Sequence, residues 1–497
     1  MQPGRERRLV TASILLGMFL AALEATAVAA AVPTAAGELG GVARYSWVFS
    51  AYLLTSTTSV PLFGKLADLY GRQRIYQAAM FVFLVGSVLC GFAGSFNQLV
   101  LFRAIQGLGA GGVMPVAITI VGDIFTLEER GRMQALFSGV WAVAGLIGPV
   151  IGGILTDTLS WRWIFYINLP FGLVSAWMLQ RYLREETQRR EHRLDILGTV
   201  SLTASVTFLL LALIEGPGSW GWSDPRTVGL LVGAAAALVT FLWQEGRAPE
   251  PMLPLDLFHN RLIAVASAGN TLLGMLLYAL TAYVPMFSQG VLGGTAVDAG
   301  SILMPILIGW PISSTLAGRL LLRIGYRPMC LAGNVLVVAG AALLATADAG
   351  TTRLEIMTAL FFVGFGLGFA SMPYLLGVQN AVAWNQRGVA TSSVQFFRTI
   401  GGTISVAVFG ALLNARLAAS AGPGVDANSA LDPAVRARLA PETLSRLTGA
   451  LLEGLGAVFV GLAVLAAAGL AVSFFFPRGS VQSQIHPERD QAPVTEP

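Results

Sequence analysis

Glu24 is the residue with the clearest chemical potential, because it interrupts an apolar stretch that runs from Leu9 to Val32. An ionised side chain near the centre of a bilayer costs about 2.5–3.5 kcal/mol on insertion scales. Packing does not require an acid there, and acids retained at such positions usually move protons or ions, or bind a cation. Glu24 therefore indicates a proton-coupled membrane transporter.

Arg103 is a cation inside a second apolar stretch, 99–122. At about 1.5 Å per residue, Arg103 lies roughly 6 Å and Glu24 roughly 12 Å below the outer ends of their helices, so the two could pair. A neighbouring arginine favours the ionised form of an acid and burial favours the protonated form, which would let Glu24 switch between two access states. The alternative is that Arg103 snorkels to the outer headgroups.

Residues suited to enzyme chemistry are scarce and scattered. The three histidines, His192, His259 and His486, fall in expected loops or the tail, so neither a metal site nor a histidine base is visible. Cys90 and Cys330 lie in apolar runs, which argues against a disulfide framework. A membrane-embedded enzyme would need a nucleophile–base pair or metal ligands. We therefore expect no enzyme, no metal and no cofactor, with the proton gradient as the driving force.

Composition predicts a polytopic membrane protein with an all-α fold. The chain has 497 residues, 55% of them hydrophobic and 12% charged, and its mean hydropathy is +0.69. A soluble domain carries about twice that share of charge. The net charge of +4 could suggest nucleic acid. However, the basic residues cluster in short loops, as membrane-orientation signals do, so we expect a bilayer and no nucleic acid as the partner.

The hydropathy pattern predicts fourteen spanning helices. If the N-terminus is cytoplasmic, inner segments hold 21 of the 31 Lys and Arg residues and outer segments hold 8, which also places the C-terminus in the cytoplasm. The N-terminus resembles a signal peptide, but its apolar run is too long for one. The expected spans are 9–32, 46–64, 75–95, 99–122, 133–156, 162–182, 196–214, 227–244, 262–288, 298–318, 328–347, 354–378, 390–413 and 449–476.

Three pairs of matching segments, about 254–259 residues apart, indicate an internal repeat. Segment 64–71 is echoed by 318–325, 107–115 by 366–373, and Arg130-Gly131 by Arg387-Gly388. Transporters are often built from such repeated halves, with the site between them. We expect a cytoplasmic N-terminus (1–8), a six-helix bundle (9–182), a linker with two extra helices (183–261), a second six-helix bundle (262–476) with a long external loop (414–448), and a disordered cytoplasmic tail (477–497).

Four motifs carry a resemblance to a known family: LEATAVAAAVP (23–33), GKLADLYGRQR (64–74), LFRAIQGLGAGG (101–112) and GLIGPVIGGIL (145–155). On these motifs the chain resembles the major facilitator superfamily and, within it, the 14-helix drug:proton antiporter family. The resemblance implies two six-helix bundles with two inserted helices. The chain departs from the family's first motif where Glu24 replaces Asp and Ala29 replaces Asn.

The resemblance also assigns roles to residues. Glu24 and Arg103 become the proton-coupling pair. A conformational latch comprises Gly64, Asp68, Gly71, Arg72 and Arg130, although a solvated ion pair worth under about 1 kcal/mol is the alternative. The motif of 145–155 is associated with antiporters, and its residues Gly145, Gly148, Pro149, Gly152 and Gly153 favour export over uptake. A generic packing helix is the alternative, since Gly148 and Gly152 form a GxxxG face.

Polar and aromatic side chains near the midplane are candidates for the substrate path: Thr26, Gln106, Trp141, Asn270, Tyr278, Trp310, Tyr374, Gln395 and Arg398. The span 298–318 holds an acid only at its edge, at Asp298, and 390–413 holds Gln395 and Arg398 instead of acids. This pattern argues against specialised recognition of divalent cations. Arg398 could meet an anionic substrate group or a helix end, and the sequence does not choose between them.

The sequence thus predicts a proton-coupled multidrug exporter of the plasma membrane, active as a monomer and conferring antibiotic resistance. It would move amphipathic compounds, cationic or neutral, by alternating access. A dedicated exporter of one metabolite, lipid or amino acid on the same fold is the alternative, and uptake is a third reading.

Overall fold

The computed structural model describes residues 4–39, 47–183, 185, 195–216, 220–248, 251, 253, 255–294, 298, 301–421 and 440–477. Every regular element within these residues is helical. The helices are α1 (Arg5–Glu38), α2 (Trp47–Tyr70), α3 (Arg72–Gly91), α4 (Phe96–Ile124), α5 (Leu127–Thr158), α6 (Trp163–Tyr166), α7 (Asn168–Tyr182), α8 (Ile196–Glu215), α9 (Pro225–Glu245), α10 (Arg261–Gly290), α12 (Met304–Ile324), α13 (Tyr326–Ala345), α14 (Arg353–Ala381), α15 (Arg387–Ala421) and α17 (Pro441–Ser473). Short 3₁₀ turns occupy Leu255–His259 and Trp384–Gln386.

Ten of the described helices are long and apolar enough to cross a membrane: α1, α3, α4, α8, α9, α10, α13, α14, α15 and α17. A helix also lies at each of the four other expected spans, namely α2, α5, α6 with α7, and α12. These four positions are not among the ten. The protein is therefore a multi-span helical membrane protein, and the count of fourteen stays a prediction.

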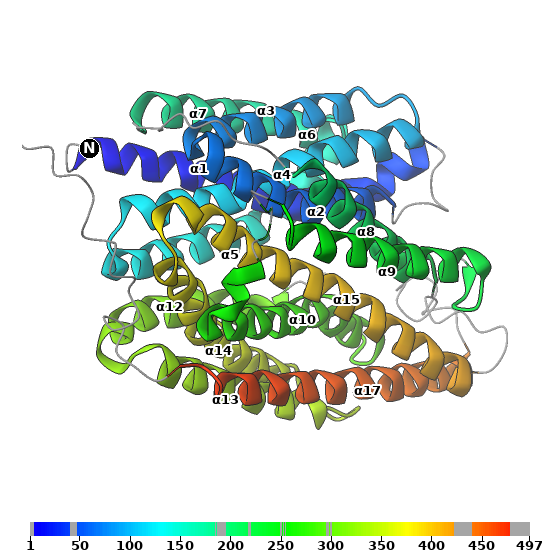
Figure 1. Ribbon diagram of the computed structural model, residues 1–497. Helices are drawn as coiled ribbons and strands as arrows, with labels where there is room; N and C mark the ends of the chain where they lie inside the picture. The colour runs from blue at the N-terminus through cyan, green and yellow to red at the C-terminus, as the bar shows by residue number, and fades with distance from the viewer. Residues whose placement is uncertain are drawn as a thin grey trace, which may run out of the picture.

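The helices form two bundles, one above the other in Figure 1. The upper bundle holds α1 to α7, and the lower holds α10 and α12 to α17. Helix α1 begins, and helix α17 ends, at the left of the view. We call this side of the molecule the termini side. Helix α15 continues to Ala421 and α17 begins at Pro441, so both helices extend into the segment 414–448 that was expected to be a loop. The tail 478–497 lies outside the described residues.

Two glycines show that the sequence repeat corresponds to a repeated backbone shape. Gly71 precedes α3 with φ 94°, and Gly325 precedes α13 with φ 88°. Positive φ favours glycine because it has no Cβ. The same sharp turn therefore joins the second and third helices of each bundle, as the echoed motif predicts.

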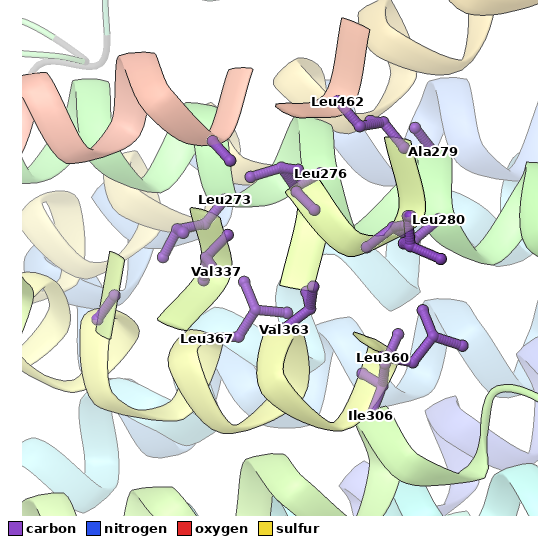
Figure 2. Close-up of a cluster of buried hydrophobic side chains, with 14 of the residues drawn as sticks. Leu273, Leu276, Ala279, Leu280, Ile306, Val337, Leu360, Val363, Leu367 and Leu462 are labelled. Atoms are coloured by element: carbon purple, nitrogen blue, oxygen red, sulfur yellow. The ribbon is translucent and has the colours of Figure 1, made fainter. Parts of the chain in front are cut away.

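The interior of the second bundle is closely packed and apolar (Figure 2). Leu276 of α10, Val337 of α13, Leu360 and Val363 of α14 and Leu462 of α17 are all fully buried. Many large apolar side chains instead face outward, among them Phe81, Val239 and Val464, each more than 60% exposed. A surface of this kind is suited to contact with lipid tails, where close packing rather than water exclusion holds helices together.

Helices α8 and α9 pack as a pair against the seam between the bundles. They contact each other, and α8 also contacts α2 and α15. The Ser205 hydroxyl donates to the Ala234 carbonyl at 2.9 Å, which joins α8 to α9. A small apolar cluster that includes Val60, Leu210 and Phe396 links α8 to both bundles. Both helices fall within the segment 183–261, and its role as an inserted linker stays a prediction.

Candidate functional site

Glu24 lies in the interior of the first bundle with 1% of its surface exposed. The Arg103 Nη1 of α4 donates to Glu24 Oε1, and the two form an ion pair. The Asn168 amide of α7 donates to the second carboxylate oxygen. The acid therefore has a donor on each oxygen and lies out of contact with bulk water.

Arg103 is held by several groups at once and is 2% exposed. Its Nε donates to the Val48 carbonyl at 3.2 Å, and its Nη1 donates to Gln106 Oε1 at 2.8 Å. The guanidinium also lies over the Tyr52 ring, 4.2 Å from the centroid. Arg103 thus points to Glu24. It does not snorkel to the outer headgroups, which was the alternative that the sequence left open.

A second layer of hydrogen bonds fixes the amides around the pair. Gln106 Nε2 donates to Ser87 Oγ at 3.1 Å, and Asn168 Nδ2 contacts the same hydroxyl at 2.8 Å. Ser87 in turn donates to the Phe165 carbonyl at 2.9 Å. Sequence reasoning did not single out Asn168, which lies in the expected span 162–182. An amide within an apolar stretch was the signal that could have identified it.

The second polar cluster joins the bundles at the termini side and centres on Asp68. Asp68 Oδ1 accepts from Arg72 Nη2 at 2.8 Å and from the Gly388 backbone N–H at 2.9 Å, and Oδ2 accepts from the Val389 N–H at 2.7 Å. Asp68 lies beyond the expected span 46–64. Burial raises the pKa of Asp68 to about 7, against the opposing effects of Arg72 and the two N–H donors.

Arg72 extends this cluster to the second bundle. Its Nη2 donates to the Trp384 carbonyl at 2.8 Å, and its guanidinium lies 3.9 Å from the centroid of the Trp384 ring. Its Nε is 3.1 Å from Asp123 Oδ2. The side chains of Arg72 and Asp68 are only 2% and 3% exposed. This pair is therefore buried, unlike the solvated ion pair that was the alternative.

Two further residues of the predicted latch, Arg130 and Gly64, also contact the second bundle, as does an ion pair between Arg387 and Asp123. Arg130 Nη1 donates to Asn380 Oδ1 at 3.1 Å, and Arg387 Nη1 donates to Asp123 Oδ1 at 2.9 Å. A Cβ added to Gly64 would lie 1.9 Å from Ser392 Oγ, so only glycine permits this approach of α2 to α15. Asp123 was not singled out from the sequence. In this conformation the two bundles are joined at the termini side.

The described residues contain no group of three His, Cys, Asp or Glu side chains that could hold a metal ion.

Comparison with known proteins agrees with this fold and these motifs. The family model of the Major Facilitator Superfamily matches residues 14–406. The chain belongs to the major facilitator superfamily.

Relatives in this superfamily include transporters from Bacillus subtilis (strain 168). The chain is 37% identical to "Multidrug transporter protein MdtP" over 83% of this chain and 76% of that protein. It is 33% identical to "Multidrug resistance protein 3" over 94% of both chains. The crystal structure of the human organic anion transporter MFSD10 (TETRAN) matches with a TM-score of 0.64, covering 95% of this chain and 100% of that one, at 15% identity. Because its identity is low, the likeness to MFSD10 shows the fold alone. The protein is thus a membrane transporter and not an enzyme.

Within this superfamily fold, the expected antiporter helix is α5, and it packs on α1 through Gly148. The Thr26 hydroxyl donates to the Ala144 carbonyl at 3.0 Å, and a Cβ added to Gly148 would lie 2.0 Å from Thr26 Oγ1. Gly145 faces Leu307 of α12, whereas a Cβ on Gly153 would meet nothing within 4 Å. Gly152 is buried, and its carbonyl accepts from Thr156. The side chain of Pro149 lies outside the described part of the chain.

Several substrate-path candidates are used in helix packing. The Asn270 amide donates to the Val394 carbonyl at 2.8 Å. Tyr374 is fully buried, and its hydroxyl contacts Asn334 and Ser473 within the second bundle. Gln106 belongs to the Arg103 network described above, and Thr26 belongs to the α1–α5 contact.

The other candidates lie on α5, α10, α12 and α15. Trp141 and Trp310 are half-buried and pack against the apolar clusters of the first and second bundles, respectively. Tyr278, Gln395 and Arg398 lie on α10 and α15, and α15 contacts α2 and α4 of the first bundle. For these three residues, contact with a substrate stays a prediction.

Proposed function

We propose that this protein exports amphipathic small molecules in exchange for protons, with Glu24 as the coupling carboxylate. The supporting observation is that Glu24 is buried and bound by Arg103 and Asn168. A protonated Glu24 would lose its ion pair with Arg103, so the proton would change how α1, α4 and α7 hold together. The names of the two bacterial relatives, which refer to multidrug transport and resistance, support the substrate class.

Alternating access would use the contacts at the termini side. In this mechanism the bundles separate there in one state and meet there in the other. The Asp68 and Arg72 cluster is suited to such a latch because its bonds cross from α2 and α3 to α15 and Trp384. Proton entry from the opposite side would protonate Glu24, and release would follow when the termini side opens.

The proton gradient supplies enough energy for this exchange. One charge moving through 100 mV yields about 2.3 kcal/mol. At about 1.4 kcal/mol per decade, one proton sustains roughly a fifty-fold gradient of a neutral solute. We also propose fourteen spans in a plasma membrane, both termini in the cytoplasm, and a monomeric working unit.

Transport in proteoliposomes with an imposed pH gradient tests the coupling role. We expect Glu24→Gln to reduce gradient-driven accumulation of a fluorescent dye at least tenfold while the protein still folds. Glu442→Gln is the matched control, because Glu442 is an exposed acid in the first turn of α17. Normal accumulation by Glu24→Gln would show that Glu24 is not the coupling residue.

A double variant separates folding from coupling. Arg103→Gln leaves the buried Glu24 charge unpaired, which costs about 3–5 kcal/mol and lowers the melting temperature. Adding Glu24→Gln removes that charge, so the double variant should regain stability without regaining proton-driven transport. If the double variant transports normally, the ion pair serves only the fold.

A dedicated exporter of one compound remains a second candidate on the same scaffold. The observation that favours it is Arg398, a fixed cation at the seam, because a single placed charge selects substrates by one chemical group.

A further inference from the structure

Arg398 is a cation of α15 that has no counter-charge among the residues that the structure describes. It lies on α15, eleven residues after Arg387, which corresponds to about 16 Å along the helix. That distance is roughly half the thickness of a bilayer's hydrocarbon core, about 30 Å. Within the described part of the chain its side chain makes no hydrogen bond or ion pair, and its Nε is shielded from water.

Close packing of α10 on α15 fixes the position of this arginine. A Cβ added to Gly274 would lie 2.1 Å from the Arg398 carbonyl oxygen and 2.9 Å from its Cγ. A Cβ added to Gly402 would lie 2.5 Å from the Tyr278 ring. The two glycines therefore bring the helix backbones together at the level of Arg398, and its side chain leaves the helix beside Tyr278.

A line of side chains connects Arg398 to the proton site. Tyr278 is near enough to interact electrostatically with both Arg398 and Tyr52. The Tyr52 ring lies under the Arg103 guanidinium, which is bound to Glu24. Two cations from different bundles thus lie on either side of a tyrosine pair, and only one of them has a carboxylate.

This asymmetry leaves an unbalanced positive charge at the seam. Glu24 is already matched by Arg103, so it offers no free negative charge to a cationic substrate. Arg398 is partly exposed, but its Nε is shielded from water and has no hydrogen-bond partner among the described residues. A carboxylate that binds the guanidinium offsets the cost of leaving it unpaired. The planar guanidinium also matches the two oxygens of a carboxylate.

Gln395 adds a second polar group on the same side of α15. It precedes Arg398 by three residues, and residues three apart are neighbours on a helix surface. Its side chain is 8% exposed, and its amide makes no hydrogen bond to the residues that the structure describes. An amide N–H can donate to the same anion that the arginine binds.

We propose that Arg398, together with Gln395 and Tyr278, binds the carboxylate of the exported compound. The inference rests on the proposed export function and narrows its substrate class to amphipathic organic anions. It revises the expectation, drawn from the sequence, of cationic or neutral substrates. A headgroup phosphate is a poorer occupant, because headgroups lie at the membrane surface and Arg398 lies at mid-depth.

Two dyes that differ in one group test the proposal. The probes are 7-(diethylamino)coumarin-3-carboxylate and the matching uncharged 3-carboxamide. Binding to the full-length protein in nanodiscs is followed by fluorescence anisotropy, without any pH gradient. We expect the wild-type protein to bind the carboxylate about tenfold more tightly than the carboxamide. A protein with no preference for the carboxylate, including one that fails to bind it, would overturn the proposal.

Variants then assign the preference to Arg398. Arg398→Gln should bring the two affinities within about twofold of each other, mainly by weakening carboxylate binding. Arg398→Lys should retain part of the preference, since it keeps the charge but not the planar fork. Arg226→Gln, at an exposed position of α9, controls for the loss of one positive charge. A preference that survives in Arg398→Gln would place the anion elsewhere.

The design separates this inference from the proposed function. Arg398→Lys covers the case in which Arg398→Gln does not fold, as judged by gel filtration and thermal melting. An unchanged dye preference in Arg398→Lys would then count against the proposal. Because dye binding needs no gradient, a carboxylate preference with no proton-driven transport would refute coupling alone. Proton-driven transport with no carboxylate preference would refute the anion site alone.

Discussion

Asn168 and Glu24 are 144 residues apart in the sequence, yet the Asn168 amide donates to a carboxylate oxygen of Glu24. The contact joins α7 to α1 and completes the donor set that Arg103 begins. In the resembling family an Asn stands five positions after the acid, where this chain has Ala29. An amide from another helix therefore supplies a polar partner to the carboxylate.

Removing that amide should weaken the proton site specifically. A hydrogen bond to a charged group contributes about 1.5–3 kcal/mol. We expect Asn168→Ala to lower the melting temperature and to reduce the number of protons taken up per dye molecule exported, as measured with a pH-sensitive dye inside proteoliposomes.

Asn334 provides the control for this prediction. It is a buried amide of α13 that donates to Ser473 at 2.8 Å and to the Cys330 carbonyl at 3.0 Å, so the acceptors of these two bonds are a hydroxyl and a backbone carbonyl. Asn334→Ala should lower stability but leave the proton ratio intact. Equal proton ratios in the two variants would mean that Asn168 supports only the fold.

The contact between α1 and α5 offers a test of close packing. Because a Cβ on Gly148 would lie 2.0 Å from Thr26 Oγ1, Gly148→Ala must push the helices apart. Overpacking of this kind costs about 1–3 kcal/mol. Thermal melting should show a clear loss for Gly148→Ala and almost none for Gly153→Ala, whose added methyl would meet nothing within 4 Å. Combining Gly148→Ala with Thr26→Gly should restore part of the loss, and its failure to do so would place the strain elsewhere.

Sequence alone predicted the parts of this protein that depend on local pattern. The apolar stretches located the helices, and the echoed glycines located the same turn at Gly71 and Gly325. The depth estimate placed Arg103 roughly 6 Å and Glu24 roughly 12 Å below the outer ends of their helices, close enough for the two side chains to pair. A charge in an apolar stretch is conspicuous, which is why these two residues were found.

Partners contributed by distant helices could not be predicted in the same way. Asp123 and Trp384 are unremarkable in sequence, and Asn168 stands out only as an amide in an apolar stretch. The roles of all three depend on how helices far apart in the chain pack. Asn270 shows that a polar residue near the midplane can also be used in a helix–helix contact. Pairing across a bundle is a property of tertiary packing that a single sequence does not encode locally.

The Asp68 cluster should make the contact at the termini side sensitive to pH. In the closed conformation, with the bundles joined at the termini side, burial raises the pKa of Asp68 to about 7. Separation of the bundles would expose Asp68, and an exposed aspartate has a pKa of about 4. The closed conformation therefore binds the proton more tightly. Linkage then requires that acidification from pH 7 toward pH 4 favours closure, and that raising the pH through 7 removes this advantage.

Spin labels at Arg74 of α3 and Gln386 near α15, both exposed, can measure this equilibrium by distance spectroscopy in nanodiscs. The two native cysteines are buried and can remain in place. We expect the fraction with short distances to rise as the pH falls from 8 to 5, by up to about tenfold in the equilibrium constant per pH unit. Asp68→Asn removes the titrating group but keeps an oxygen that can accept from Gly388 or Val389, so its distances should change much less with pH. Asp123, Glu185, Arg72 and Arg387 face the same cluster and are unchanged in this variant. A response as steep in Asp68→Asn as in the wild-type protein would therefore assign the pH sensitivity to those neighbours and not to Asp68.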